Sequence, residues 1–388
     1  MSTPEAVIVD AVRTPVGRRG GVLAHWHPTD LLAQTLRCLL DRVDIDEDAI
    51  ADVIIGCVMQ NGDQAGNLAR WAALGAGLPE SVPATTIDRQ CGSGQQAIHF
   101  AAQAVRAGDY RFALAGGVES MSRVELGPLF NPAAGPGPWY GERSLHRYDG
   151  NLGAQGPAAD VVARKWGLAR TQLDDFSARS HERAAAATAA GHFASQLVPV
   201  TGTDGATVSG DEGIRANLDR VKIAGLAPVF ADDGLITAAN ASQISDGAAA
   251  VLIASRDAAA QAGLPVRATI RAMAVAADDP QLQFTAVIPA AHKALQQAGL
   301  QMSDIDRVEV NEAFACVPLG FQQAFDVADD RLNVNGGSIA VGHPLGSTGA
   351  RMMTDLVVEL ERSAGHYGLL VICEGGGMAN ATIIERAG

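Results

Sequence analysis

The chain has 388 residues, 47% of them hydrophobic, and a net charge of −14. This length allows a large buried core in two or three domains or in one duplicated unit. The acidic balance argues against a nucleic-acid binder, and no apolar run approaches the roughly 20 residues that cross a bilayer.

The N-terminal residues show no basic leader followed by an apolar core, so we expect no signal peptide. The five cysteines are irregularly spaced and contain no C-x-x-C pair, which argues against a disulfide framework and against a metal site. A cytoplasmic enzyme without membrane insertion fits these features.

Two distant parts of the chain resemble each other in order and pattern. An acidic lead-in and a buried strand occur at 46–58 and again at 302–314. Each is followed by a strand, a glycine turn and a helix, and then by another buried strand. These segments are 83–109 and 110–120 in the first copy, and 331–360 and 367–377 in the second. The matching order predicts two related α/β units.

A long segment, 122–242, separates the two copies and returns to the first unit at 242–255. It opens with a Pro/Gly-rich stretch at 126–141, which predicts a loop. A helical pattern at 158–168 follows. The insertion is expected to be a lid or a substrate-binding domain, with a neutral appendage or an oligomerisation element as the alternatives.

A second helical pattern in the insertion covers 171–193. We expect Thr171 to cap this helix and Gly191 to stop it.

Cys91 lies in the glycine turn DRQCGSG, directly before a predicted helix. The partial positive charge of a helix N-terminus lowers a thiol pKa, and its free N–H groups can receive a developing oxyanion. A buried core cysteine is the alternative, which Gly92 and Gly94 disfavour because a core position needs bulk. Cys91 is therefore a candidate nucleophile.

Two further glycine turns carry reactive side chains. His343 lies in GHPLG, where Pro344 restricts its backbone, and is a candidate base or oxyanion donor. Cys373 lies in CEGGG and, like Cys91, is a cysteine in a glycine-rich turn. A second thiol, with an ordinary pKa near ~8.5, suits proton transfer to or from a carbon or a thiol. Two thiols and a histidine together indicate acyl transfer through a thioester.

At this point the chain resembles a known family, the thiolases, which cleave 3-ketoacyl-CoA or condense acetyl-CoA. The resemblance runs nearly end to end through VIVDAVRTPVG, CGSG, AGGVESMS, NASQISDGAA, NEAFA, NVNGGSIAVGHPLGSTGAR and CEGGG. The residues of these motifs are most similar to those of actinobacterial thiolases that act on fatty-acyl or steroid-side-chain CoA esters.

The resemblance implies a duplicated five-layered α/β/α/β/α fold with an inserted helical loop domain. The expected parts are an N-terminal α/β half at 1–121, a CoA-binding loop domain at 122–242, a return to the first half at 243–262 and a C-terminal α/β half at 263–388.

The resemblance also assigns roles in catalysis. Cys91 would carry the acyl group, His343 would activate it and donate to an oxyanion of the substrate thioester, and Cys373 would be the acid/base. Asn311 would hold a water that completes the first oxyanion site. The N–H groups of Cys91 and Gly375 would form the second, where one donor is worth ~3–4 kcal/mol.

Coenzyme A would be a substrate, with no tightly bound cofactor. Ser242 resembles the family serine on the pantetheine arm, and Arg215 the arginine near the nucleotide end, although a solvated surface charge is the alternative for Arg215. Phe230 and Phe314 resemble apolar wall residues. The resemblance and the apolar run at 59–78 favour a homodimer or homotetramer.

Two departures from the family pattern stand out. The usual His-Met-Gly is Ala154-Gln155-Gly156 here, and Glu374 follows Cys373 in place of a small or aliphatic residue. That carboxylate would raise the pKa of Cys373 or point to solvent. The first departure, with the loop at 126–141, favours medium or bulkier acyl chains.

Three alternatives remain open from the sequence. These are a short-chain acetyl-CoA acetyltransferase, a ketoacyl synthase, and a non-catalytic acyl-CoA-binding subunit of a β-oxidation complex. The second thiol disfavours the synthase, and the intact Cys91, His343 and Cys373 disfavour the non-catalytic subunit.

Overall fold

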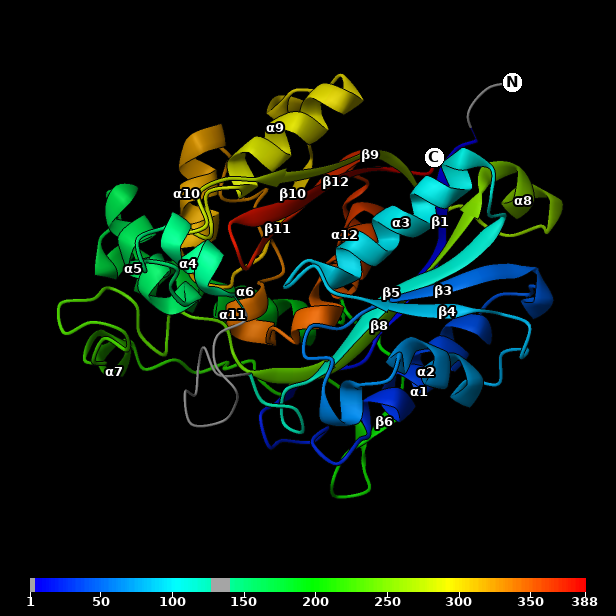
Figure 1. The fold of residues 1–388 in the computed structure, drawn as a ribbon, viewed down its shortest axis with the longest axis horizontal. Helices are drawn as coiled ribbons and strands as arrows, with labels where there is room; N and C mark the ends of the chain where they lie inside the picture. Colours follow the sequence, from blue (N-terminus) through cyan, green and yellow to red (C-terminus); the bar gives the residue numbers. More distant parts are fainter. Residues whose placement is uncertain (1–3, 127–139) are drawn as a thin grey trace.

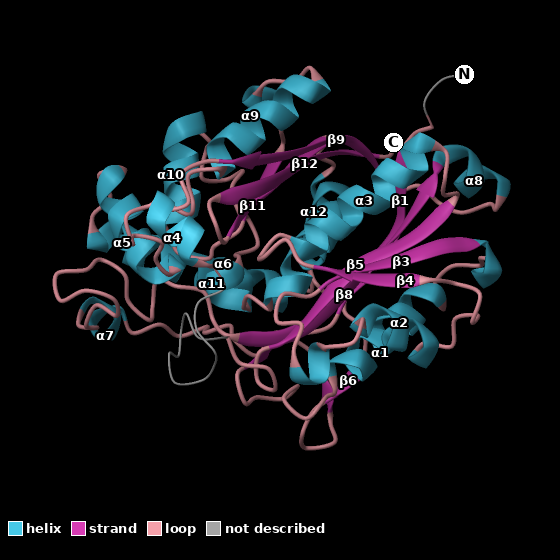
Figure 2. Ribbon diagram, viewed as in Figure 1, coloured by secondary structure: helices cyan, strands magenta, loops and turns pink. Residues whose placement is uncertain are grey.

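The computed structural model describes residues 4–126 and 140–388. Its main sheet has ten strands and is seen as two leaves in Figure 2. One of the ten, β2 (Gly17–Arg18), pairs only with β8 and lies off the main order. The other strands follow in the spatial order β4 (Ala84–Ile87), β3 (Ile50–Gly56), β5 (Phe112–Ser120), β8 (Ser245–Ser255), β1 (Ala6–Arg13), β9 (Ala268–Ala277), β12 (Met378–Arg386), β11 (Tyr367–Glu374) and β10 (Arg307–Val310). The leaves join where β1 and β9 pair antiparallel.

The two leaves repeat one topology, which confirms the predicted duplication. In the first, β3 is parallel to β5, and β5 is antiparallel to β8. In the second, β10 is parallel to β11, and β11 is antiparallel to β12. A 3₁₀ turn precedes the first strand of each series, at Glu47–Ala49 and Met302–Asp304. An isolated bridge between Val308 and Leu332 takes the place of β4 in the second leaf.

Helices cover both faces of both leaves (Figure 1), which is why the central strands are apolar without alternation. Between the leaves lie α3 (Ser93–Ala107) and α12 (Leu345–Ser363). The outer face of the first leaf packs on α1 (Pro28–Leu40) and α2 (Leu68–Gly75). The second leaf packs on α9 (Val287–Ala298) and α10 (Cys316–Phe325). The five expected α/β/α/β/α layers are thus present. Two short helices complete these halves, α8 (Arg256–Gln261) and α11 (Ser338–Val341).

The chain between β5 and β8 carries its own helices and a small hairpin. They are α4 (Glu142–Arg147), α5 (Gln155–Lys165), α6 (Arg170–Ala189), α7 (Arg220–Ala224), β6 (Val200–Thr201) and β7 (Thr207–Val208). Most of the Pro/Gly-rich stretch at 126–141 lies outside the described residues.

The helix starts in this insertion differ from the expected ones. The first of the two predicted helices, α5, begins three residues earlier than 158. Thr171 does not cap α6, because the helix begins at Arg170 and the Gln172 side chain accepts the Ala169 N–H at 2.8 Å. Gly191, with φ +74°, follows the end of α6 as expected.

Within the described parts of the chain, we find no helix that is both long and apolar enough to cross a membrane.

Candidate active site

Cys91 and His343 occupy equivalent places in the two copies. Cys91 lies two residues before α3, and His343 lies two residues before α12. These two helices pack against each other at their N-termini, where a Cβ on Gly94 would lie 2.7 Å from the Gly346 carbonyl oxygen. Leu345 packs on the apolar cluster that contains Cys91. The fold therefore brings the histidine turn onto the cysteine turn.

The cysteine turn is held by local hydrogen bonds from polar side chains. Asp88 Oδ1 accepts the Gln90 N–H at 2.6 Å, and the Ser93 hydroxyl accepts the Arg89 N–H at 2.8 Å. Gln90 adopts φ +50°, which is uncommon for a side chain larger than glycine. The turn therefore fixes the backbone of Cys91 before the helix begins.

The thiol of Cys91 is buried and neutral in the resting protein. Burial raises its pKa to about 12, and the charge of Glu374 acts in the same direction. The expected lowering by the helix N-terminus is therefore wrong, because desolvation of the thiolate outweighs a partial charge that the thiol meets from two residues outside the helix. Forming the thiolate requires a base.

The backbone N–H groups of Cys91 and Gly375 oppose this trend. Both stabilise a negative charge on the Cys91 sulfur and so lower its pKa. Two N–H groups that point at one sulfur are also placed to receive an oxyanion on the carbon bonded to it.

Cys373 lies near the end of β11, on the face that packs with Phe314 and Cys316. Burial raises its pKa well above the ordinary value, and negative charge on Cys91 raises it further. The expectation of an ordinary thiol pKa is therefore wrong. A neutral thiol at this position donates a proton readily only to a strong base such as a carbanion.

His343 is buried and held from both sides of its ring. Its Nδ1 lies 2.7 Å from the Thr348 hydroxyl, and its Nε2 lies 3.3 Å from Asn311 Nδ2. Its backbone N–H donates to the Gln243 carbonyl at 3.2 Å, an arrangement that uses Gly342 at φ +117°. Burial and, next, the charge of Arg351 lower the pKa of His343 to about 3. The imidazole is therefore neutral at pH 7.

Gln155, at the start of α5, reaches the nucleophile from the insertion. Its Nε2 lies 4.0 Å from the Cys91 sulfur and lowers the pKa of that thiol. The next residue, Gly156, lies against the ring of Phe230, which would be 2.2 Å from an added Cβ. Phe230 in turn meets Phe314 edge to face, with 6.3 Å between ring centroids. The expected apolar wall residues therefore lie next to each other and beside the residue that contacts Cys91.

Glu374 is fully buried, and neither of its carboxylate oxygens has a hydrogen-bond partner among the described residues. A Cβ on Gly92 would lie 1.8 Å from Glu374 Oε1, so a larger residue at position 92 would displace this carboxyl group. Burial raises the pKa of Glu374 well above its usual value, with Arg89 acting against the rise and Asp88 adding to it. Of the two expected outcomes for Glu374, pointing to solvent is wrong.

This buried carboxyl group makes stability depend on pH. Because the folded pKa of Glu374 is raised, its contribution is fully present below the unfolded value of about 4.5 and is lost as the pH rises toward the folded pKa. We expect Glu374→Gln to raise the thermal midpoint at pH 8, and the difference from wild type to vanish near pH 4. Thermal melts at both pH values measure this.

The exposed carboxyl group of Glu142 supplies the control, and Glu142→Gln should leave both melts unchanged. A Glu374→Gln protein with the same midpoint as wild type at both pH values would show that the carboxyl group is ionised at no cost.

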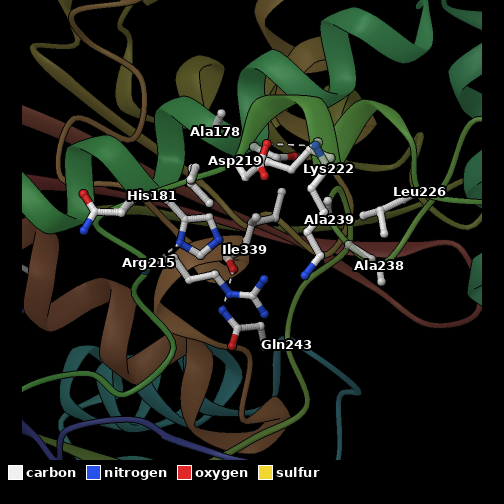
Figure 3. A pocket seen from close by; sticks show the side chains of 15 residues that line it. Ala178, His181, Arg215, Asp219, Lys222, Leu226, Ala238, Ala239, Gln243 and Ile339 are labelled. Carbon is white, nitrogen blue, oxygen red and sulfur yellow. Dashed lines mark hydrogen bonds between the residues drawn. The ribbon is translucent and has the colours of Figure 1, made fainter.

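A pocket of about 320 Å³ lies beside this centre, between the insertion and the core (Figure 3). Its lining includes Arg215, Lys222 and His181, together with the apolar Leu226 and Ala238. Burial, and after it the charge of Arg215, lower the pKa of His181 to about 4. Two cations, Arg215 and Lys222, and one acidic side chain, Asp219, thus face a largely apolar pocket.

The pocket is linked to His343 through Gln243, although His343 itself is not one of the lining residues. Gln243 lines the pocket, its carbonyl accepts the His343 N–H, and its Nε2 donates to the Ile339 carbonyl at 2.8 Å. Ser242 lies beside the lining residues Ala241 and Gln243, and its N–H donates to the Ala313 carbonyl at 2.9 Å.

Sequence reasoning missed several side chains that hold the site. Glu119 accepts the Gly346 N–H at 2.9 Å and so ties the histidine turn to the first copy. Thr348 and Ser338 fix His343 and Asn311. Of these side chains, only Thr348 had a signal in the sequence. It follows Pro344 by four residues, the spacing at which two residues of a helix are neighbours. No group of three or more His, Cys, Asp or Glu side chains suited to a metal ion occurs in residues 4–126 and 140–388.

Two family models match this chain, one over each of its two α/β halves. Residues 6–257 match the family model described as thiolase, N-terminal domain, and residues 264–386 match thiolase, C-terminal domain. The steroid 3-ketoacyl-CoA thiolase FadA6 of Mycobacterium tuberculosis is 48% identical over 98% of this chain and 94% of its own length.

Two further proteins are similar over nearly their whole length. A 3-ketoacyl-CoA thiolase of Erwinia tasmaniensis is 44% identical over 98% of this chain and 99% of its own length. The crystal structure of an acetyl-CoA acetyltransferase of Bacillus anthracis superimposes with a TM-score of 0.90 at 35% identity, covering 100% of both chains.

Proposed function

The chain belongs to the thiolase family of acyltransferases, and from this premise we propose that it cleaves 3-ketoacyl-CoA with CoA into acetyl-CoA and a shortened acyl-CoA. The observation that carries the proposal is the link between the pocket and the centre, since Gln243 both lines the pocket and accepts the N–H of His343.

Coenzyme A binds in this pocket as a substrate and not as a resident cofactor. Arg215 and Lys222 face its phosphates, the apolar lining takes the adenine and the pantetheine arm, and Ser242 lies along the arm. The loop domain of residues 122–242 supplies most of these contacts. Because the whole protein carries a charge of −14, these local cations must attract the anionic ligand.

In the first half of the reaction Cys91 attacks the keto carbon of the substrate. His343 Nε2 takes the thiol proton, and the N–H groups of Cys91 and Gly375 receive the oxyanion. The bond between C2 and C3 then breaks and leaves its electron pair on the acetyl-CoA enolate. His343 and a water held by Asn311 stabilise that enolate, and Cys373 protonates it at C2.

In the second half a new CoA takes the place of acetyl-CoA. The Cys373 thiolate takes the proton of the CoA thiol, and the CoA sulfur attacks the thioester on Cys91. The bond between the Cys91 sulfur and the acyl carbon breaks, and the proton held by His343 returns to Cys91.

We propose that the protein acts in the cytoplasm as a homodimer or homotetramer. Strand β4 is the edge of the sheet, and its side chains are only partly buried. Nearby on α2 and α3, Trp71 and Phe100 are 60% and 40% exposed. An open edge and large exposed aromatic side chains favour pairing with a second copy.

Thiolysis across a series of 3-ketoacyl-CoA chain lengths tests the proposed function. Gly156 places no side chain against the Phe230 ring, so we expect kcat/KM for medium or bulkier chains to exceed that for acetoacetyl-CoA. Each methylene buried in a fitting pocket adds up to ~1 kcal/mol, so the preference should be several-fold or more.

A sterol side-chain ester extends the series, because the mycobacterial relative is named a steroid thiolase. A profile with acetoacetyl-CoA as the best substrate would instead indicate a short-chain acetyltransferase. No CoA-dependent turnover with any ester would indicate a non-catalytic subunit.

A further inference from the structure

A line of buried hydrogen bonds runs from Arg351 to His343. Arg351 Nη2 donates to the Ser338 hydroxyl at 3.0 Å, and that hydroxyl donates to Asn311 Oδ1 at 2.6 Å. Asn311 Nδ2 then lies 3.3 Å from His343 Nε2. All four side chains are buried, with Arg351 and His343 each 3% exposed.

The direction of this line follows from the guanidinium group. Because Arg351 can only donate, the Ser338 hydroxyl must accept from it and donate its own hydrogen bond to Asn311. The carbonyl oxygen of Asn311 therefore faces Ser338, and its amide nitrogen faces His343. An amide nitrogen also only donates, so His343 Nε2 must be the ring nitrogen with the lone pair.

The other side of the ring gives the same tautomer. The Thr348 hydroxyl donates to the Pro344 carbonyl at 2.8 Å, which leaves it as an acceptor toward His343 Nδ1. The ring proton therefore resides on Nδ1. Two independent lines of hydrogen bonds agree on one protonation state of His343.

Arg351 is itself fixed by a cluster of buried charges. Asp355, one turn further along α12, accepts from Arg351 Nη1 at 2.7 Å and from Arg13 Nε at 3.1 Å. Arg13 binds Asp211 with two hydrogen bonds of 2.7 and 3.0 Å. Two arginines and two aspartates thus balance their charges and tie β1, the insertion and α12 together. A buried ion cluster stabilises a fold only weakly, but it holds its members in one geometry.

We propose that Arg351 is a positioning residue for the transfer of the Cys91 proton, acting through Ser338 and Asn311 to keep the lone pair of His343 on Nε2. The inference rests on the proposed roles of Cys91 and His343. With the proton on Nε2 instead, His343 could not accept the proton of a thiol on that side, and the neutral Cys91 would remain inert.

Ser338→Ala tests the proposal with the smallest change, because it removes the link and leaves the ion pair between Arg351 and Asp355 intact. Without the hydroxyl, the Asn311 side-chain amide is free to rotate and exchange the positions of its oxygen and nitrogen. We expect the rate of Cys91 acylation, measured by rapid quench, to fall about tenfold or more, with KM for CoA unchanged. Thr354→Val is the matched control, since it removes a buried hydroxyl on α12 that bonds only the Ala350 carbonyl.

The ring proton can be observed without any turnover. Solid-state ¹⁵N spectra of histidine-labelled protein, assigned by the loss of signals in His343→Asn, should show His343 protonated on Nδ1 in wild type. Ser338→Ala should give a mixture of tautomers. Asn311→Asp, which presents only acceptors, should move the proton to Nε2 or protonate both nitrogens.

The two readouts separate this inference from the proposed function. A wild-type tautomer and a wild-type acylation rate in Ser338→Ala would overturn the positioning role. An unchanged tautomer in Asn311→Asp would overturn it even if Ser338→Ala failed to fold. If the tautomer shifts as expected but no acyl enzyme forms in wild type, the proposed function fails and the hydrogen-bond assignment stands.

Discussion

Replacing Cys91 with alanine is expected to lower kcat for thiolysis by about 10⁴-fold or more, because no other group can carry the acyl chain. KM and the dissociation constant for CoA should change little, since the pocket lining does not include Cys91. Steady-state thiolysis and calorimetric titration with CoA measure the two effects separately.

Cys38→Ala is the matched control, because Cys38 is a free cysteine on α1, in the outer helical layer. It should retain wild-type turnover. Substantial CoA-dependent thiolysis by Cys91→Ala would contradict a thioester on Cys91.

Cys373→Ala is expected to lower kcat by about 10²–10⁴-fold, the range that one general acid/base group contributes. Acylation of Cys91 from a simple acyl-CoA should be impaired less than full thiolysis, because the proposed role of Cys373 is used once in that acylation, on the leaving CoA sulfur, and twice in thiolysis, on C2 and on the CoA sulfur. His343→Asn should show the opposite pattern and slow acylation itself, since it removes both the base and an oxyanion donor. Single-turnover acylation and full thiolysis, measured side by side, distinguish these outcomes.

Cys316→Ala controls for the loss of a buried thiol, since Cys316 is equally buried and packs in the same apolar cluster as Cys373. It should leave the ratio of acylation to thiolysis at the wild-type value. A Cys373→Ala protein with wild-type thiolysis would show that another group moves the proton.

The local parts of this site could be predicted from the sequence. Glycine turns, short apolar strands and the repeated order are encoded within a few residues, so the duplication and the placement of Cys91 and His343 before two helices followed directly. The family resemblance supplied the proposed roles of Asn311 and Gly375, which no local pattern carries.

The parts that depend on burial or on distant pairing could not be predicted. The sequence predicts a lowered pKa for Cys91, but burial in the structure raises it. The prediction fails because sequence patterns do not show how deeply the thiol is buried. Arg13 pairs with Asp211 and Asp355, which lie 198 and 342 residues away in the chain. The same limit applies to Ser338 on α11, whose hydroxyl bonds Arg351 on α12 and Asn311, which directly follows β10.

The central claim is that the acyl chain passes through a thioester on Cys91. The most direct test is mass spectrometry of the protein after brief exposure to 3-ketoacyl-CoA without free CoA, followed by acid quench and proteolysis. The account predicts one added acyl group, on the peptide that contains Cys91, which disappears when CoA is added before the quench. An adduct on a different cysteine, or one that CoA does not remove, would contradict it.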